Sequence, residues 1–326
     1  MIIVTGATGF IGSNIVANLN EHGRTDLLLV DDLGSQGKWK NIAKRRFLDL
    51  VDYRNLNELL PTLKQADAVF HMGANSSTTT TDGDEILRVN LHATMEWWKW
   101  CTNTSTPFIY ASSAATYGDG EQGFVDDQSP LALDKLAPLN LYGWSKHQFD
   151  KWAVERAAEG KNPPQWVGLK FFNVYGPNEY HKGSMMSLIA KNTALIARGE
   201  TIKLFKSHKE GYVDGGQLRD FVYVKDCCAM MMWLLEHRDV SGIFNLGTGK
   251  ARSFVDLMLA IGEALGKPVS IEYVDMPESI RPNYQYFTQA NVQKLKSEGY
   301  SADFFSIESG TADYVKNHLT QSDVYR

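Results

Sequence analysis

Thr5-Gly6-Ala7-Thr8-Gly9-Phe10-Ile11-Gly12 is the stretch that decides the fold of this 326-residue chain. It follows the apolar run Met1–Val4, which predicts a buried strand, and it precedes residues 13–19, whose apolar positions recur at helical spacing. A strand, a glycine turn and a helix in this order form the arrangement that binds a dinucleotide. The stretch therefore predicts a dinucleotide site at the first strand, with the glycine spacing GxxGxxG.

Each glycine of this turn has a separate physical role. Gly6 allows the tight turn, Gly9 lets backbone N–H groups approach a pyrophosphate, and Gly12 lets the helix pack close to the strand. Because the helix N-terminus faces the anion, Phe10 and Ile11 at that end are expected beside the cofactor.

A second apolar strand, Leu27–Val30, ends in Asp31 and Asp32, about 20 residues after the glycine turn. A carboxylate there can hold the ribose hydroxyls of adenosine, and Asp31 alone would favour NAD because it repels a 2′-phosphate. Lys38 could offset that repulsion and hold a 2′-phosphate. These residues leave the choice between NAD and NADP open.

Composition excludes several classes of protein. An apolar content of 43% and a charged content of 22% are those of an ordinary globular protein, and the net charge of −5 argues against binding nucleic acid. No apolar run approaches the roughly 20 residues that span a bilayer, and no signal peptide is apparent. The three cysteines suit neither a disulfide framework nor a metal site. We therefore expect a cytoplasmic protein without a metal.

Asp67–Ala74 predicts a further strand that runs into a small-residue turn, where Gly73 and Ala74 leave room for a cofactor. The hydroxyl-rich run Asn75–Thr81 is either a flexible loop or a set of donors to a polar substrate. Asn90, in the next helix, lies either at the surface or behind the cofactor loop.

The candidate catalytic residues follow in the next strand and helix. Tyr142 and Lys146 are four residues apart on a predicted helix, so they share a face at about 5–6 Å between Cβ atoms. A phenol has a pKa of ~10, and a nearby ammonium together with a positive nicotinamide ring favours the phenolate. Ser113, which ends the preceding strand, can hydrogen-bond the same substrate hydroxyl.

These motifs, in this order and separation, resemble the extended short-chain dehydrogenase/reductase family, which acts mostly on nucleotide sugars. The resemblance implies an α/β fold, with a Rossmann-like doubly wound parallel sheet and a smaller mixed α/β C-terminal substrate domain. The expected division is a cofactor domain of residues 1–172 with a returning segment at about 219–247, and a substrate domain of residues 173–218 and 248–326.

The second half narrows the resemblance. Val167–Pro177 predicts a strand and turn, and Asn178–Met185 follows with the run HKGSM. Together with the run 112–118 and residues 285–290, this resembles the nucleotide-sugar epimerases that act at C6 of an ADP-linked heptose. The resemblance implies that Lys182 is a second acid/base group, that one tightly bound NADP serves each subunit, and that the protein is a homo-oligomer, a homopentamer in that group.

The resemblance also carries over a set of binding residues. The cofactor set is Gly6, Gly9, Phe10, Ile11, Gly12, Asp31, Asp32, Lys38, Met72, Gly73, Ala74, Asn75, Ser76, Asn90, Tyr142, Lys146, Val174 and Lys182. The substrate set is Ser113, Asn173, Ser184, Lys191, Phe205, Lys206, Arg219 and Tyr284. Asn75 and Lys191 depart from the pattern, since some members have cysteine and histidine there.

Arg219 resembles the arginine that clamps the diphosphate; the alternative is a surface ion pair with Asp220. Residues 209–218 look like a loop insertion. Asp226 is expected to be the N-cap of a helix over Cys227–Glu236, and the segment after Tyr300 is expected to form a final helix.

Three alternatives stay open. Another nucleotide-sugar enzyme of the superfamily, a UDP-hexose 4-epimerase or a dehydratase, would share the first half. A dehydratase carries an Asp-Glu pair after the strand-end serine, where this chain has Ala114 and Ala115. A non-catalytic dinucleotide sensor would have no use for Ser113, Tyr142 and Lys146.

Overall fold

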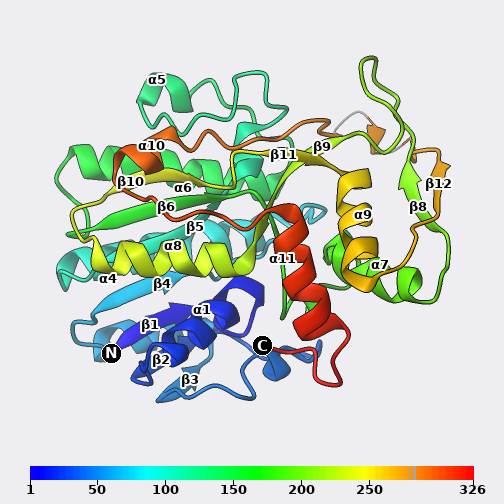
Figure 1. The fold of residues 1–326 in the computed structure, drawn as a ribbon. Helices are drawn as coiled ribbons and strands as arrows, with labels where there is room; N and C mark the ends of the chain where they lie inside the picture. The colour runs from blue at the N-terminus through cyan, green and yellow to red at the C-terminus, as the bar shows by residue number, and fades with distance from the viewer. Residues whose placement is uncertain (279, 282–283) are drawn as a thin grey trace.

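Seven parallel strands form the main sheet of the computed structural model, which describes residues 1–278, 280–281 and 284–326 (Figure 1). Their order across the sheet is β10-β6-β5-β4-β1-β2-β3. The strands are β1 (Ile2–Thr5), β2 (Leu27–Val30), β3 (Asp49–Val51), β4 (Ala68–His71), β5 (Phe108–Ser113), β6 (Trp166–Phe171) and β10 (Gly242–Leu246). The strand order reverses direction at β1, which confirms the predicted Rossmann-like sheet.

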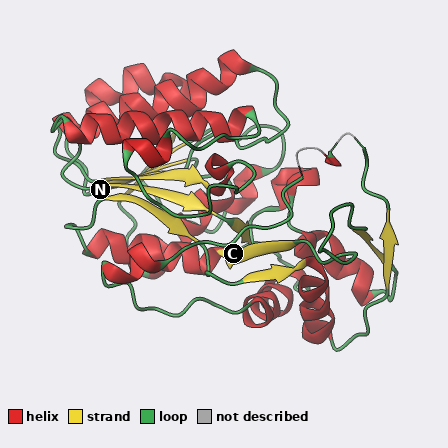
Figure 2. Cartoon of the chain, turned by 90° about the horizontal axis from the view of Figure 1, so that it is seen from above, coloured by secondary structure: helices red, strands yellow, loops and turns green. Residues whose placement is uncertain are grey.

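Helices cover both faces of this sheet (Figure 2). On one face α1 (Phe10–Glu21) packs beside α8 (Val224–Glu236), and on the other lie α4 (Ala93–Asn103) and α6 (Leu141–Ala158). Side chains of β1 alternate between the two cores: Ile2 and Val4 join the first, and Ile3 joins the second. Both faces of the sheet are therefore buried, as a doubly wound sheet requires.

A smaller unit of mixed structure is formed by segments that lie before and after β10 in the chain. The strand β9 (Leu218–Tyr223) runs parallel to β7 (Asn173–Tyr175) and antiparallel to β11 (Ala251–Ser253), while β8 (Ile202–Phe205) and β12 (Ile271–Val274) form a parallel pair. The helices α7 (Leu188–Ala197), α9 (Phe254–Leu265) and α11 (Ile307–Tyr314) share its core. The chain passes between the two sheets from β6 to β7, from β9 through α8 to β10, and from β10 to β11; the domain boundaries themselves stay a prediction.

Shorter elements complete the described chain. The remaining α-helical segments are α2 (Leu56–Leu59), α3 (Gly83–Ile86), α5 (Pro130–Leu133) and α10 (Gln293–Ser297). Turns of 3₁₀ helix lie at Lys38–Asn41, Tyr53–Asn55, Leu60–Thr62, Ala114–Tyr117 and Tyr180–Met185, and π-helical turns at Leu87–His92 and Val315–Leu319. None of the helices in the part of the chain that the structure describes could cross a membrane.

One predicted helix boundary is wrong. The helix α8 begins at Val224 with Tyr223 as its N-cap, so Asp226 lies inside the first turn. Its carboxylate accepts a hydrogen bond from the backbone N–H of Phe305 at 3.0 Å. Asp226 therefore joins α8 to the C-terminal segment instead of capping the helix.

Candidate active site

A cavity of about 740 Å³ lies at the carboxyl ends of β1, β4, β5 and β6. This is the edge at which open α/β sheets bind ligands. The structure brings many of the sequence-predicted residues to this one cavity: Gly6, Gly9, Phe10, Ile11, Gly12, Asp31, Lys38, Met72, Gly73, Ala74, Asn75, Ser76, Ser113, Tyr142, Lys146, Asn173, Val174 and Lys182.

The glycine turn has no room for side chains. Gly6 has a φ of +62°, and a Cβ there would lie 2.6 Å from the backbone nitrogen of Gly73. A Cβ on Gly12 would lie 2.0 Å from the carbonyl oxygen of Gly6, so α1 could not approach the turn. Gly9 is the N-cap of α1 and supplies no side-chain cap. The free N–H groups of α1 therefore face the cavity, and this cradle fits the pyrophosphate of a dinucleotide.

Asp31 and Asp32, the carboxylates predicted to bind the adenosine ribose, already form hydrogen bonds and ion pairs within the chain. Asp31 accepts hydrogen bonds from the backbone N–H of Thr8 at 2.8 Å and from its hydroxyl at 2.6 Å. The Lys38 ammonium lies 3.1 Å from Asp31 and 2.5 Å from Asp32. Asp32 is not among the residues that line the cavity. Thr8, which sequence reasoning passed over between the glycines, fixes the orientation of Asp31.

Asn90 supports the loop that follows β4. It is buried, its Oδ1 accepts from the N–H of Asn75 at 2.8 Å, and its Nδ2 donates to the Asn75 carbonyl at 3.0 Å. The same Nδ2 reaches the hydroxyl of Ser145 on α6 at 3.0 Å. Of the two predicted placements for Asn90, the structure shows the one behind the loop.

Ser113, Tyr142 and Lys146 form one side of the cavity, here called the α6 wall. Asn140 caps α6 by accepting from the N–H of Gly143 at 2.8 Å. A Cβ on Gly143 would lie 2.7 Å from the Ala115 carbonyl oxygen, so glycine lets α6 approach the end of β5.

Electrostatics on the α6 wall differ from the sequence-based expectation. Burial raises the pKa of Tyr142, and a hydrogen bond with Ser113 opposes that rise. Burial also lowers the pKa of Lys146 to about 8, opposed by the charge of Asp150. In the chain by itself the pKa of Tyr142 is therefore shifted away from the phenolate, and the pull of a nicotinamide on that pKa stays a prediction.

A buried ionic network, which no sequence motif predicted, lies behind the α6 wall. Asp150, one turn after Lys146, is fully buried and lies 2.6 Å from the ammonium of Lys170 on β6. The same carboxylate accepts from Tyr110 at 2.9 Å and from Ser112 at 2.7 Å. The network joins α6, β5 and β6 directly behind the reactive side chains.

Lys182 lines the same cavity from a different element, the loop Asn178–Ser187, here called the Lys182 loop. Its ammonium lies 5.2 Å from the ring centroid of Phe10, the first residue of α1. Burial lowers the pKa of Lys182, the charge of Glu179 opposes that, and the charge of Lys191 adds to it. An amine with a lowered pKa, held against an aromatic face, suits proton transfer near neutral pH.

Glu179 anchors the base of the Lys182 loop. It is fully buried, and it accepts from the N–H of Ser187 at 2.6 Å, from the Ser187 hydroxyl at 2.7 Å and from Tyr314 at 3.1 Å. His181, beside Lys182, lines the cavity and lies 3.2 Å from the side chain of Asn41. Burial, with the nearby charges of Lys38 and Lys182, lowers the His181 pKa to about 4. Sequence reasoning quoted the HKGSM run for its lysine alone and missed this histidine.

Six of the predicted substrate residues lie outside the lining of this cavity: Ser184, Lys191, Phe205, Lys206, Arg219 and Tyr284. Lys191, on α7, donates to the carbonyl of Ser184, which belongs to the Lys182 loop. Lys206 lies 3.5 Å from Asp275.

Arg219 is buried and does not form the surface ion pair with Asp220 that was the alternative to a diphosphate clamp. The carboxylate of Asp220 instead accepts from the N–H and hydroxyl of Thr248. The guanidinium lies 5.3 Å from the ring of Tyr284 and 5.7 Å from that of Phe254, which lines the cavity. The cluster therefore adjoins the cavity through Phe254.

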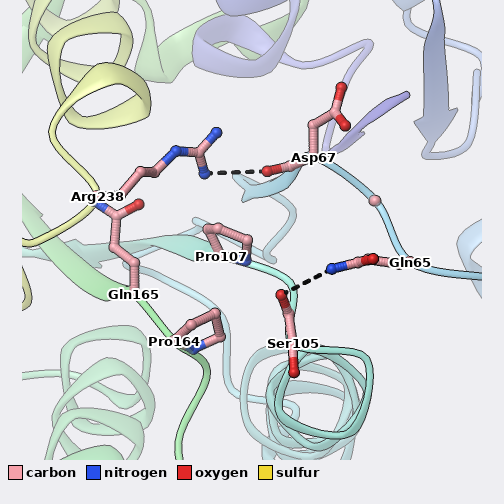
Figure 3. A pocket seen from close by; sticks show the side chains of 8 residues that line it. Gln65, Asp67, Ser105, Pro107, Pro164, Gln165 and Arg238 are labelled. Atoms are coloured by element: carbon pink, nitrogen blue, oxygen red, sulfur yellow. Dashed lines mark hydrogen bonds between the residues drawn. The ribbon is translucent and has the colours of Figure 1, made fainter.

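A second pocket, of about 330 Å³, lies at the amino ends of β4 and β5, away from this cavity (Figure 3). Arg238 donates there to the carbonyl of Asp67 at 3.1 Å, and Gln65 donates to that of Ser105 at 3.4 Å. None of its lining residues belongs to the predicted site. In the described residues, no group of three or more His, Cys, Asp or Glu side chains could hold a metal ion.

Comparison with known proteins gives consistent results. Residues 2–247 match the NAD dependent epimerase/dehydratase family. The chain is 49% identical to an ADP-L-glycero-D-manno-heptose-6-epimerase of Fusobacterium nucleatum, over 100% of both chains, and 46% identical to one of Nitratidesulfovibrio vulgaris, again over 100% of both. Its fold is similar to the crystal structure of the Helicobacter pylori ADP-L-glycero-D-manno-heptose-6-epimerase, with a TM-score of 0.78, 27% identity and coverage of 97% and 95% of the two chains. The Thermus thermophilus UDP-glucose 4-epimerase in complex with NAD gives a TM-score of 0.72 at 25% identity, covering 96% and 97%.

Proposed function

The chain belongs to the NAD dependent epimerase/dehydratase family, and from this membership and the site we propose that it is an ADP-L-glycero-D-manno-heptose 6-epimerase. One observation carries the proposal beyond the family: Lys182 faces the same cavity as Tyr142, from a different element of the chain. The enzyme converts ADP-D-glycero-β-D-manno-heptose to its L-glycero epimer.

The reaction needs two acid/base groups because the C6 oxygen occupies a different position in each epimer. A nicotinamide held by the glycine turn and Lys146 would supply the hydride chemistry at C6, which passes through a ketone and ends with hydride on the opposite face. One of Tyr142 and Lys182 takes the proton from the C6 hydroxyl, and the other gives a proton to the C6 oxygen when the ketone is reduced. Ser113 donates to the sugar oxygen and holds Tyr142, while Asn173 lines the cavity beside them.

The residues that line the cavity also indicate which groups would bind the cofactor. The glycine turn and the N-terminus of α1 would bind the pyrophosphate, Asp31 the adenosine ribose, and Lys146 the nicotinamide ribose. We propose NADP as the physiological form, since the Lys38 ammonium lies at the adenosine end and could pair with a 2′-phosphate. The homo-oligomeric state, the cytoplasmic location and a role in lipopolysaccharide core synthesis stay predictions.

The rival activities are less well supported by the site. The positions after Ser113 are Ala114 and Ala115, so a dehydratase would lack its acid and base at that place. A 4-epimerase would not need Lys182. A non-catalytic sensor would not need the buried Tyr142 and Lys146 that face the cavity together.

The purified protein tests this proposal directly when it is incubated with ADP-D-glycero-D-manno-heptose and no added cofactor. We expect the L-glycero epimer to form, because the cofactor is regenerated in each cycle and stays bound. Turnover of UDP-galactose instead would reassign the chain to the 4-epimerases, and no turnover of either substrate by protein that carries dinucleotide would favour a sensor.

A further inference from the structure

The segment Asp323–Arg326 lies against the Lys182 loop, although 144 residues separate Tyr180 from Val324 in the chain. The hydroxyl of Tyr180 donates to the Val324 carbonyl at 2.9 Å, and the N–H of Arg326 donates to the Asn178 side chain at 3.0 Å. The rings of Tyr180 and Tyr325 meet edge to face, with centroids 5.2 Å apart. Residues just before Lys182 are thus bound by the end of the chain.

The same segment also binds α1, beside which the C-terminus lies in Figure 1. The Arg326 side chain is 9% exposed; its guanidinium lies 2.7 Å from Glu21 and donates to the Asn14 side chain at 3.2 Å. Lys44 pairs with Asp323 at 2.7 Å. The segment therefore connects the Lys182 loop to the helix whose first residue, Phe10, lies under the Lys182 ammonium.

The Lys182 loop needs such support because its own backbone is irregular. Asn178 has a φ of 72°, which non-glycine residues rarely adopt, and Gly183 interrupts the 3₁₀ turn with φ 55° and ψ −120°. Glu179 fixes one end of the loop from behind, toward Ser187 and Tyr314. On the side toward α1, the contacts to the loop come from Asn14, Ser13, Asn41 and Asp323–Arg326.

We propose that Asp323–Arg326 is a strap that positions Lys182 for proton transfer, with Arg326 as its principal positioning residue. The inference rests on the proposed function, since it assigns the strap to the second acid/base group of that reaction. Arg326 does not line the cavity. Its side chain holds the strap to Glu21 and Asn14 of α1. Its backbone N–H binds Asn178, and the neighbouring residues Val324 and Tyr325 contact Tyr180. A misplacement of about 1 Å at a reacting group can cost on the order of a hundredfold in rate.

The test compares Arg326→Ala and Tyr180→Phe with wild type. The control is Arg24→Ala, which breaks a more exposed arginine–carboxylate pair, of 2.9 Å to Asp26, at the amino end of β2. Four quantities are measured: kcat, KM, the melting temperature, and the fraction of bound nicotinamide that is reduced during steady turnover. The reduced fraction rises when the ketone has formed but its reduction is slowed because the proton donor is misplaced. A loss of stability alone would not raise this fraction.

We expect Arg326→Ala to lower kcat about ten- to a hundredfold. KM and the melting temperature should stay near those of the control. Reduced nicotinamide should accumulate when turnover starts from the epimer that Tyr142 deprotonates, because Lys182 then has to protonate the ketone oxygen. Tyr180→Phe removes one hydroxyl and should show the same changes at smaller magnitude. It tests the strap even if Arg326→Ala folds poorly. Arg326→Lys, which keeps a charge near Glu21, should be intermediate.

Wild-type kcat and wild-type reduced fraction in both variants would overturn the strap, as would a loss of activity that only follows the loss of folded protein. Lys182→Ala in the same assay separates the two proposals. If Lys182→Ala turns over normally, the proposed function fails; if Lys182→Ala is inactive while both strap variants are normal, only the strap fails.

Discussion

Tyr142 and Lys146 lie one turn apart on α6, whereas Lys182, which lines the same cavity, lies on an irregular loop. The α6 wall is held from behind by the buried pair of Asp150 and Lys170. The Lys182 loop is held by separate hydrogen bonds from Tyr314, Asn41 and the strap. The first arrangement follows from spacing within one helix and its neighbouring strands, and the second depends on residues brought together from distant parts of the chain.

The largest effect is expected from a variant that removes the reactive amine of the Lys182 loop and leaves the α6 wall intact. Lys182→Ala should lower kcat by about 10²–10⁴-fold, which is typical of a lost acid/base group. Lys182 takes no part in the buried ionic network behind the α6 wall. Bound dinucleotide should therefore still co-purify, and the melting temperature should change little. Near-normal turnover would mean that Lys182 is an ordinary loop lysine and that the comparison has no catalytic meaning.

The next effect is on stability and concerns the α6 wall. Asp150→Ala leaves the ammonium of Lys170 buried without its partner, which should cost about 3–5 kcal/mol of unfolding free energy. Urea unfolding measures this loss. Asp134→Ala is the control, since it breaks an exposed pair with Lys151 of the same 2.6 Å length and should cost much less. Equal losses in the two variants would show that the buried network does not hold α6.

The third effect is a pH dependence of the free energy of unfolding, and it arises from Asp226, which binds the segment just before α11. Burial raises the pKa of Asp226 to about 7, whereas in the unfolded chain it lies near 3.8. Between these pH values the folded state holds a proton that the unfolded state has released, so stability falls as pH rises through this window. Asp226→Asn should remove about 2 kcal/mol of the fall between pH 5 and pH 8.

Melting temperatures of wild type and Asp226→Asn across that pH range measure the difference. Asp226 binds the N–H of Phe305, just before α11, and α11 supplies Tyr314 to Glu179 at the base of the loop. A wild-type melting temperature that rises from pH 5 to pH 8, with the variant unchanged, would contradict the buried placement of this carboxyl.

The smallest effect is expected at the adenosine end, where Asp31 and Lys38 lie apart from both acid/base groups. Lys38→Met should weaken retention of NADP relative to NAD by about tenfold, because one charged contact to a phosphate is lost. Analysis of the dinucleotide that denatured protein releases measures the ratio. Lys40→Met, an exposed neighbour, is the control, and an unchanged ratio in Lys38→Met would show that the 2′-phosphate proposal is wrong.

The sequence predicted what depends on short-range pattern. The glycine turn, the strands β1, β2, β4, β5 and β6, and the pair Tyr142 and Lys146 follow from local spacing, and the main sheet is parallel and doubly wound as expected. The three-residue strand β3 is only partly buried and carries too little apolar pattern to be recognised. Asp226 was misassigned because an aspartate before an apolar run is typical of an N-cap, whereas α8 already begins two residues earlier.

What the sequence could not predict depends on long-range contacts. The partners of Glu179, the pair of Asp150 and Lys170, and the strap have no local signature, because each joins residues from different elements. Lys182 itself was named from a family resemblance, since a loop lysine alone predicts nothing.

The central claim is that the α6 wall and the Lys182 loop each supply the acid/base group for a different epimer. The most direct measurement is the rate at which each of the two ADP-heptose epimers reduces the bound nicotinamide in Tyr142→Phe and in Lys182→Met. The account predicts a crossed result, in which one variant loses oxidation of the D-glycero epimer and the other loses oxidation of the L-glycero epimer. Equal slowing of the same epimer in both variants, or wild-type rates with both epimers in Lys182→Met, would contradict it.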